Sequence, residues 1–396
     1  MSTDALIIGG GPGGATAAVL LARAGWRVTV VEKAEFPRRK VCGEFISATS
    51  LPLLRELGVD AAFLEAAGPT VRRVGFFAGD EILTAAMPSG LDWMERWGRA
   101  LGREHLDTML LDAAARAGAT IHQPCKVMEL RKAQNGFVCV ASAADKTIEL
   151  KARLVIAANG SWERGPSPLP PLAAHRASDL LAFKAHFRDC DLPADLMPLL
   201  VFPGGYGGMV HSDDGRVSLS CCIRRDALQR AREKHREQHA ATATLHHIAA
   251  TCGGARDALK RATLDGAWLS AGPIRPGLRR RYGDGMFFAG NAAGEAHPVV
   301  AEGISMAIQS AGLLARHLIA RQDDVLAGST AEAARGYDAD WRTGFAPRIR
   351  AAAVFAHLAM RPQLSRPLVP LLKLFPQALT LGAWFSGKTT KVVAAP

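Results

Sequence analysis

Three glycines near the start of the chain have the spacing of a nucleotide-binding turn. The segment "DALIIGGGPGGATAAVLLARAGWRVTVVEK" is typical of a strand, a tight turn, a helix and a second strand, and Gly9, Gly11 and Gly14 satisfy the GxGxxG pattern. The first glycine permits the turn, the second lets the backbone approach a pyrophosphate, and the third lets the helix pack on the strand. Amides at the helix start favour the phosphates. We therefore expect a dinucleotide site, without a choice between NAD and FAD.

The second strand ends in residues that suit the sugar of such a ligand. Glu32 follows the glycines at about the twenty-residue spacing at which a carboxylate accepts hydrogen bonds from a ribose. Lys33 beside it is placed near the adenosine. In the next segment, "PRRKVCGEFIS", Cys42 is followed by Ser47 rather than by a second cysteine, so dithiol chemistry is not expected. We interpret Cys42 as a small residue that packs near the cofactor.

A late segment, "FAGNAAGEAHPVVAEGIS", has the small and apolar residues expected where the chain packs closely against a ligand. It starts as a buried strand, passes through small residues and Pro298, and opens a long apolar helix at Gly303. The first amides of that helix can face an anion or a developing negative charge. Asn291 stands in the middle of the segment.

Three side chains are candidates for proton transfer, and each has a structural alternative. His211, His297 and Glu44 have suitable chemistry, but a lone histidine is more often a structural or solvated group. The seven cysteines lack metal-ligand spacing, so we predict neither a metal site nor a disulfide framework.

The elements that position these residues can be placed from local patterns. Residues 102–121 are helical, with Arg103 at the start, where it would either cap the helix, pair locally or face the ligand. Asn135 and Gly136 predict a hairpin, "PGGYGGM" at 203–209 predicts another without a second nucleotide fingerprint, and residues 213–215 predict a turn. From Ala331 the chain is helical; its apolar end could lie on a membrane, cover a substrate or pack as a terminal helical pair.

Composition and charge restrict the class of protein. The chain has 396 residues, 48% of them hydrophobic, without repeats or low-complexity tracts, which excludes disordered and solenoid proteins. The net charge of +11 suits nucleotides, anionic membranes or an acidic carrier protein, although solvated basic faces would explain it equally. Nucleic acid is not expected, because aromatic residues are not interleaved with the basic clusters. The start of the chain has no signal-peptide pattern, and we expect a cytoplasmic protein, either free or peripheral to a membrane.

The ordered set of motifs resembles a known family. The chain resembles the single-component FAD-dependent oxidoreductases of the p-hydroxybenzoate hydroxylase and geranylgeranyl reductase-like superfamily. The resemblance is carried, in chain order, by GxGxxG, the acid Glu32, K-x-C-G, Arg103 before a helix, a strand ending in Asn159 and Gly160, and "GNAAG…P…EGI". The family's two aspartates are Asn159 and Asn291 here. Tyr206 of the reductase pattern is present without its tryptophan and proline, and the tryptophan signature of flavin-dependent halogenases is missing.

The resemblance implies FAD as the cofactor and NAD(P)H as a transient reductant. It implies that backbone near Val127 meets the adenine, that Asn291 contacts the ribityl chain, and that Gly294, Pro298 and Gly303 lie under and beside the isoalloxazine ring. It places Arg103 and either Arg39 or Lys40 at the pyrophosphate or ribityl region. The full predicted cofactor set is Gly9, Gly11, Gly14, Glu32, Lys33, Arg39, Lys40, Cys42, Arg103, Val127, Asn291, Gly294, Pro298 and Gly303.

The predicted fold class is α/β, with a discontinuous Rossmann-type FAD-binding domain, an inserted mixed β-sheet substrate domain and a C-terminal helical segment. The expected boundaries are 1–70, 99–165 and 270–325 for the FAD domain, 71–98 and 166–269 for the substrate domain, and 326–396 for the helical segment.

The predicted activity is monooxygenation, using NAD(P)H and O₂, of a lipophilic aromatic or polyketide-like small molecule. The alternative is a flavin-dependent reductase or dehydrogenase of a prenyl or polyene lipid, which K-x-C-G favours and the altered tyrosine pattern opposes. A third class is a flavin-binding sensor without turnover.

Overall fold

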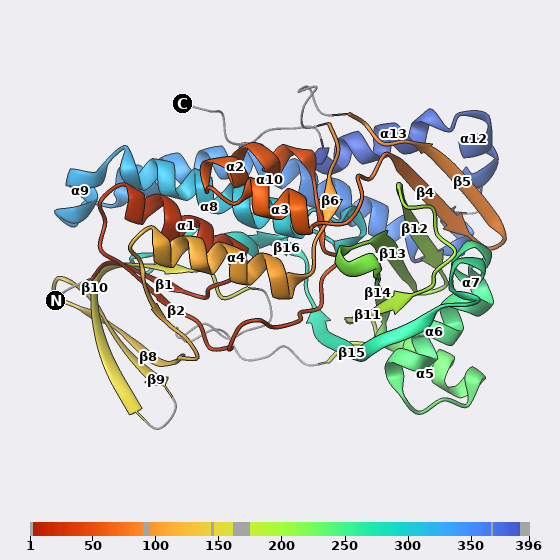
Figure 1. Cartoon of the computed structure of the whole chain (residues 1–396), viewed down its shortest axis with the longest axis horizontal. Coiled ribbons are helices and arrows are strands. Elements are labelled where there is room, and N and C mark those ends of the chain that lie inside the picture. The colour runs from red at the N-terminus through yellow and green to blue at the C-terminus, as the bar shows by residue number, and fades with distance from the viewer. Residues whose placement is uncertain (1–2, 90–95, 144–145, 161–174, 366, 389–396) are drawn as a thin grey trace.

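The computed structural model describes residues 3–89, 96–143, 146–160, 175–365 and 367–388. Two sheets stand at opposite ends of its long axis, joined by long helices on one side (Figure 1). The predicted α/β fold with a C-terminal helical segment is confirmed.

The first sheet is built around parallel apolar strands. Its order is β17-β18-β10-β1-β2-β7, with β8 and β9 added beside β10. β1 and β2 bury nearly every side chain, and β10 buries its last four residues, Leu154 to Ala157, as strands covered on both faces do. The bounds are Thr3–Ile8 (β1), Val28–Val31 (β2), Thr120–His122 (β7), Lys126–Ala133 (β8), Gly136–Ala143 (β9), Lys146–Ala157 (β10), Tyr282–Gly283 (β17) and Met286–Phe288 (β18).

Three helices pack together over one face of this sheet. α1 (Pro12–Arg23) contacts both α4 (Arg103–Arg116) and α8 (Gly303–Ile319), and all three contribute to one apolar core. α4 and α8 start at the predicted residues, Arg103 and Gly303. The prediction of a helix over residues 102–121 is wrong at its end, because α4 stops at Arg116, Gly118 has a φ of +101°, and residues 120–122 form β7. Short elements complete this lobe: β3 (Phe45–Ile46), α2 (Leu51–Glu56), α3 (Asp60–Ala66), β6 (Arg99–Ala100), β16 (Gly277–Leu278), β19 (Gly294–Glu295) and α9 (Gln322–Leu326).

The second sheet is mixed and has the order β15-β11-β14-β13-β12-β4-β5. Its neighbours are antiparallel except for the parallel pair β12 and β4. Helices α5 (Arg225–His235), α6 (Ala240–Thr251) and α7 (Gly253–Leu259) lie at its outer end (Figure 1). The strands are Arg73–Ala78 (β4), Glu81–Ala86 (β5), Leu180–Arg188 (β11), Leu196–Phe202 (β12), Gly205–His211 (β13), Val217–Arg224 (β14) and Thr263–Ile274 (β15).

The hairpins and the turn predicted from glycine-containing patterns are confirmed. β8 and β9 pair across Asn135, β12 and β13 pair across Pro203 and Gly204, and a 3₁₀ turn at Asp213–Gly215 joins β13 to β14. The domain boundaries themselves stay a prediction, and the one between 165 and 166 lies outside the described residues. The strands of the second sheet do come from two separate stretches of chain. β4 and β5 precede strands β7 to β10 of the first sheet, and β11 to β15 follow them.

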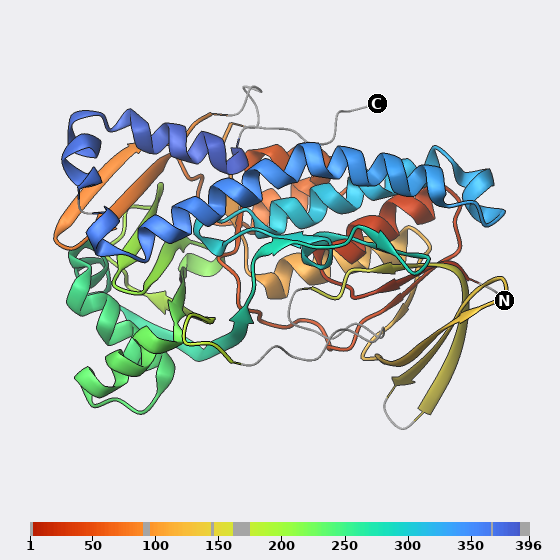
Figure 2. The same cartoon turned by 180° about the vertical axis from the view of Figure 1, so that it is seen from behind.

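The C-terminal helices run along the whole molecule. α10 (Ala331–Ala359) packs beside α8 and continues towards the second sheet (Figure 2). It is followed by α11 (Pro362–Ser365), α12 (Leu368–Leu374), α13 (Gln377–Ala383) and a π-helical turn, Trp384–Lys388. No single helix among the described residues is long and apolar enough to cross a membrane, although the bent pair formed by 362–374 and 377–388 would pass by length and composition.

Candidate active site

A cavity of about 620 Å³ lies at the carboxyl ends of the parallel strands. Its wall combines the β1–α1 turn, the end of β2, residues 38–42, the start of α4, residues 125–127, the end of β10, residues 289–291 and the start of α8. This is the crevice in which open α/β sheets bind their ligands, and its volume is within the range of about 300–1,000 Å³ usual for small-molecule sites.

The glycine turn has the backbone geometry that the motif predicts. Gly9 has a φ of +105°, in the region that favours glycine, and Gly11 caps the start of α1. A Cβ at Gly14 would lie 1.8 Å from the carbonyl oxygen of Gly9. Gly9 and Gly11 line the cavity, whereas Gly14 lets α1 approach the turn.

Glu32 is buried and tied to the same turn. Its carboxylate accepts hydrogen bonds from the backbone N–H of Gly10 at 2.7 Å and of Ala34 at 2.9 Å. Lys33 and Val127 also line the cavity near it. The carboxylate is therefore oriented before any ligand binds.

Arg103 joins the cavity to a buried carboxylate. Its guanidinium donates two hydrogen bonds to Asp107, at 2.6 and 2.7 Å, and Arg38 approaches the same carboxylate at 3.3 Å. Burial alone would lower the pKa of Arg103, but Asp107 and Cys42 outweigh it and raise that pKa, so the arginine stays charged. Arg103 therefore makes the predicted local ion pair and also lines the cavity, and its contact with a ligand stays a prediction.

A second buried ionic network begins at the cavity and leads into the second sheet. Arg39 lines the cavity, and its Nη2 lies 2.8 Å from Nδ1 of His186. Nε2 of His186 lies 2.8 Å from the Glu44 carboxylate, which also accepts a hydrogen bond from Lys184. Glu44, Lys184 and His186 are fully buried, and Glu44 has a φ of +66°. Burial would raise the pKa of Glu44, but His186 and Lys184 lower it to about 2.

Asn291 lines the cavity and is held by a neighbouring ion pair. Its side-chain amide donates to Glu295 at 3.3 Å, and Glu295 also accepts from Arg279 at 2.9 Å. Gly294 has a different role from the one predicted, since it does not line the cavity. A Cβ there would lie 2.5 Å from the Trp341 ring, so its small size serves packing against α10.

The three candidate proton-transfer residues lie outside the cavity wall. His211 bonds to the carbonyl oxygen of Leu192 at 2.8 Å, which is a structural contact. Nδ1 of His297 lies 3.2 Å from the Tyr206 hydroxyl, where the segment before α8 crosses to β13. Burial lowers the pKa of His297 to about 4, so it is neutral at physiological pH. The Glu44 carboxylate is connected to the cavity through His186 and Arg39.

Most of the predicted cofactor residues come together in this cavity. Pro298 is exposed and, like Gly14 and Gly294, does not line it. The predicted residues that do line it are Gly9, Gly11, Glu32, Lys33, Arg39, Lys40, Cys42, Arg103, Val127, Asn291 and Gly303. Sequence reasoning missed Asp107, Lys184 and His186. Asp107 had a signal, because it lies one helical turn after Arg103; the other two had none.

The described residues fit FAD. Nε of Arg39 is buried at the cavity without a hydrogen-bond partner among them, so an anionic or polar ligand atom would satisfy it. If Gly11 carried a Cβ, the nearest atom to it would be Nη2 of Arg103, at 3.6 Å. This open space leaves room for a pyrophosphate. The N-termini of α1 and α8 both open into the same cavity.

Comparison with known proteins agrees with this fit. The family described as "FAD binding domain" matches residues 2–333. Digeranylgeranylglycerophospholipid reductase 2 of Methanopyrus kandleri is 25% identical over 379 residues, covering 91% of this chain and 88% of the relative. The rifampicin monooxygenase of Streptomyces venezuelae is 30% identical over 157 residues, covering 40% and 32%.

Solved structures show the same fold. The myxobacterial chondrochloren halogenase superposes with a TM-score of 0.78 at 20% identity, covering 96% of this chain and 90% of that one. The chain spans 38% to 63% of the length of the curated relatives that it matches first. From the family match over residues 2–333, the chain belongs to the family described as "FAD binding domain", and the cavity fits the cofactor that this family binds.

Proposed function

We propose that the protein is a monooxygenase that hydroxylates a lipophilic aromatic or polyketide-like substrate with NAD(P)H and O₂. One oxygen atom enters a C–H bond of the substrate, the other leaves as water, and NAD(P)H supplies the two electrons. Bound FAD would supply the redox chemistry between NAD(P)H and oxygen. The chain's own residues bind the cofactor, orient the substrate and exclude water.

The observation that carries the proposal is the protonation state of three polar groups outside the cavity wall, His297, Tyr206 and Glu44. His297 is neutral, and burial raises the pKa of Tyr206 well above its usual value, so its hydroxyl is a weak acid. Glu44 is an ionised acceptor. Of these groups, none readily gives up a proton near neutral pH. Both reactions take up one proton overall, but saturating a carbon–carbon double bond needs a donor that delivers it to a substrate carbon, whereas oxygenation uses it to form water. The lack of a ready donor among these three groups therefore supports oxygen transfer.

Positive charge around the cavity supports the same chemistry. Arg103 and Arg39 lie at its wall, and the first amides of α8 open towards it at Gly303. Fixed donors in a buried site stabilise negative charge more strongly than water-exposed ones. We infer that these groups stabilise the negative charge that builds up when electrons arrive.

Two further partners are proposed, NAD(P)H and an acidic carrier protein. No second glycine fingerprint accompanies the β12–β13 hairpin, and we infer that NAD(P)H binds transiently over the same cavity. The basic surface suits an acidic carrier protein as a means of delivering the substrate. We place the reaction in the cytoplasm.

A second candidate is reduction of a prenyl or polyene lipid. It is supported by the sequence similarity to the Methanopyrus reductase, which extends over 91% of this chain. It is also supported by Tyr206, which lies buried in the second sheet beside His297. Under this alternative Tyr206 would donate the proton that completes the reduction.

Isotope labelling separates the two candidates. The FAD-loaded protein is incubated with long-chain phenols or prenyl lipids, deuterated NAD(P)H and oxygen gas carrying the heavy isotope, and the products are analysed by mass spectrometry. Heavy oxygen in the product supports the proposal. Deuterium on substrate carbon without added oxygen would overturn it in favour of the reductase. The Tyr206→Phe variant sharpens the result, because it should abolish reduction but spare oxygenation.

A further inference from the structure

Large exposed hydrophobic side chains are concentrated at the C-terminal end of the molecule. Fourteen such side chains occur among the described residues, and eight of them lie between Leu364 and Phe385. Leu374 is 74% exposed, and Phe375 and Phe385 are each 58% exposed. Ile82 on β5, against which α12 and α13 pack, is a ninth. We call this set, Ile82 together with Leu364, Leu368, Leu371, Leu374, Phe375, Leu381, Trp384 and Phe385, the C-terminal apolar surface.

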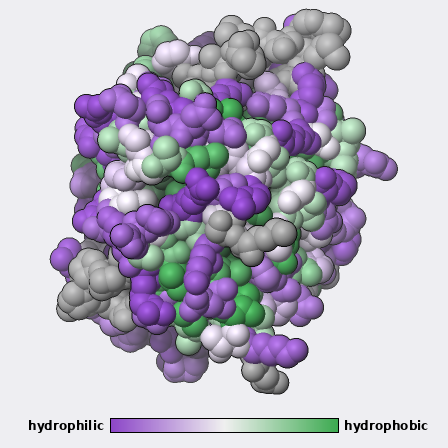
Figure 3. Space-filling model, turned by 90° about the vertical axis from the view of Figure 1, so that its left-hand side faces the viewer, coloured by the Kyte–Doolittle hydropathy of each residue, from purple (hydrophilic) through white to green (hydrophobic). Residues whose placement is uncertain are grey.

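The surface is unusual for this molecule. At the opposite end of the long axis, hydrophilic side chains are mixed with hydrophobic patches (Figure 3). Scattered exposed hydrophobic residues need no explanation, but a contiguous group marks a place where something binds.

The charge of the same segment indicates the kind of partner. From Trp341 to Pro396, a stretch that contains most of this surface, the sequence has eight Lys or Arg residues and no Asp or Glu. Arg348 and Lys388 among them are buried, whereas Arg342, Arg350 and Lys373 are exposed. A second copy of the chain would bring two basic segments together, which like-charge repulsion opposes. An anionic lipid surface would attract both features, at about 1 kcal/mol for each basic residue near the headgroups.

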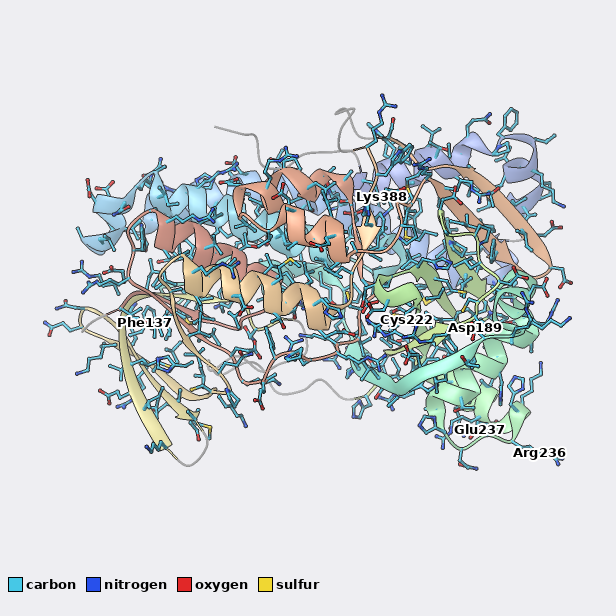
Figure 4. All side chains as sticks on the ribbon, viewed as in Figure 1. Phe137, Asp189, Cys222, Arg236, Glu237 and Lys388 are labelled. Carbon is cyan, nitrogen blue, oxygen red and sulfur yellow. The ribbon has the colours of Figure 1, made fainter. Side chains whose placement is uncertain are left out.

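The segment is fixed to the molecule at both ends. Lys373 pairs with Glu81 at 2.7 Å, and the hydroxyl of Thr380 donates to the Ala86 carbonyl at 2.7 Å, so α12 and α13 are held on β5. At the inner end Lys388 is buried and donates to Glu302 at 2.9 Å and to the Val300 carbonyl at 2.8 Å. Figure 4 places Lys388 near the middle of the molecule, where the two lobes meet.

This inner attachment brings the surface close to the cofactor cavity. Glu302 directly precedes Gly303, which lines that cavity. A second cavity of about 570 Å³ lies between α10 and the final turn, and Trp384 and Phe385 of the apolar surface line it together with Pro347 and Leu313. A lipophilic molecule that leaves a bilayer at this surface would meet an apolar groove before the lobe junction.

We propose that the C-terminal apolar surface binds the interface of an anionic phospholipid bilayer. Its short helices lie along the membrane plane, as amphipathic interfacial helices do, with Trp384 and Phe385 at the headgroup level and Lys373, which is 50% exposed on α12, near the lipid phosphates. This inference concerns binding alone and stands apart from the proposed oxidation chemistry.

Vesicle co-sedimentation tests the proposal. The FAD-loaded full chain is mixed with phosphatidylcholine vesicles, with or without phosphatidylglycerol, and the bound fraction is measured against lipid concentration. We expect binding to the phosphatidylglycerol vesicles, and an at least tenfold weaker affinity for the double variant Leu374→Glu, Phe375→Glu. Met128→Glu is the matched control, because Met128 is 59% exposed on β8 of the other lobe, and it should bind as the native chain does.

Three results would overturn the proposal. They are absence of vesicle binding, equal binding of the double variant and the native chain, and equal binding to both kinds of vesicle, which would remove the argument from charge. Light scattering without lipid tests whether a second copy of the chain binds this surface instead. If the native chain is a dimer and the double variant is a monomer, the surface is assigned to a second copy. Both side chains project from the fold, so unchanged flavin content and melting temperature of the variant show that a loss of binding is not a loss of folding.

Discussion

The glycine turn at the start of the chain and the buried network at the junction of the lobes both contact the same cavity, yet they are built in opposite ways. The turn, Gly9 to Gly14 with Glu32, comes from one continuous β1–α1–β2 unit and uses backbone groups. The network joins Glu44 to Lys184 and His186, which are 140 and 142 residues away in sequence, and uses charged side chains.

This difference has consequences for stability. The turn depends on the absence of side-chain atoms, so a substitution is unfavourable because it adds volume. The network depends on mutual compensation of charges that are fully buried, so a substitution is unfavourable because it leaves a charge unpaired. The Glu44 and Gly14 variants described below separate these two kinds of dependence.

Removal of the central carboxylate should have the largest effect. Glu44→Ala leaves Lys184 buried without its partner, and we expect a loss of about 3–5 kcal/mol in the free energy of unfolding, measured by denaturant titration. The double variant Glu44→Ala, Lys184→Met should lose less than the single one, since it removes both charges. Glu129→Ala, at a pair that is more than half exposed on both sides, is the control and should change stability by less than about 1 kcal/mol. A double variant as unstable as the sum of its singles would show that the network is not coupled.

Addition of one methyl group in the glycine turn should come next. Gly14→Ala places a carbon against the Gly9 carbonyl, and we expect a loss of about 3 kcal/mol together with poor FAD retention. Gly382→Ala is the matched control, because a Cβ there meets nothing within 4 Å and Gly382 lies in a helix. It should leave stability unchanged or slightly raised. Native-like stability of Gly14→Ala would contradict the packing role.

Acid titration should reveal a smaller effect near the lobe junction. The folded pKa of His297 is about 4 and its ordinary value 6.5, so the unfolded chain takes up a proton first as the pH falls. Stability is therefore lost between about pH 6.5 and 4, by about 3 kcal/mol from this residue. The difference in unfolding free energy between the native chain and His297→Gln should change over that window. Glu44 acts at lower pH, because its stabilisation is lost as the pH falls from 4.5 towards 2. A difference that does not vary with pH would contradict the burial of a neutral His297.

Loss of one amide at the cavity should have the smallest effect. Asn291→Leu removes a predicted ribityl hydrogen bond, and we expect FAD to bind about fivefold more weakly, consistent with one hydrogen bond of about 1 kcal/mol. The dissociation constant is measured by flavin fluorescence, with the melting temperature of the FAD-free protein as the control for folding. Unchanged affinity would remove Asn291 from the ribityl contact.

The sequence predicts the parts of the site that are local. Gly9, Gly11 and Glu32 were predicted because turn, helix start and acid lie within one short unit, and Arg103 because it begins a helix. Lys184 and His186 could not be predicted, since they occupy an alternating strand pattern that leaves open which buried carboxylate they will meet. Gly294 shows the same limit: its small size was correctly noted, but the neighbour that requires it is Trp341, distant in sequence.

The most direct test of the proposed oxygenation is rapid mixing. The FAD-loaded protein is reduced without oxygen, then mixed with oxygenated buffer in the presence of long-chain phenols, and the flavin absorbance is followed. The proposal predicts a transient spectrum, distinct from both reduced and oxidised flavin, that appears before reoxidation and whose decay accompanies product formation. Single-step reoxidation at the rate of free flavin, with every phenol tried, would contradict it.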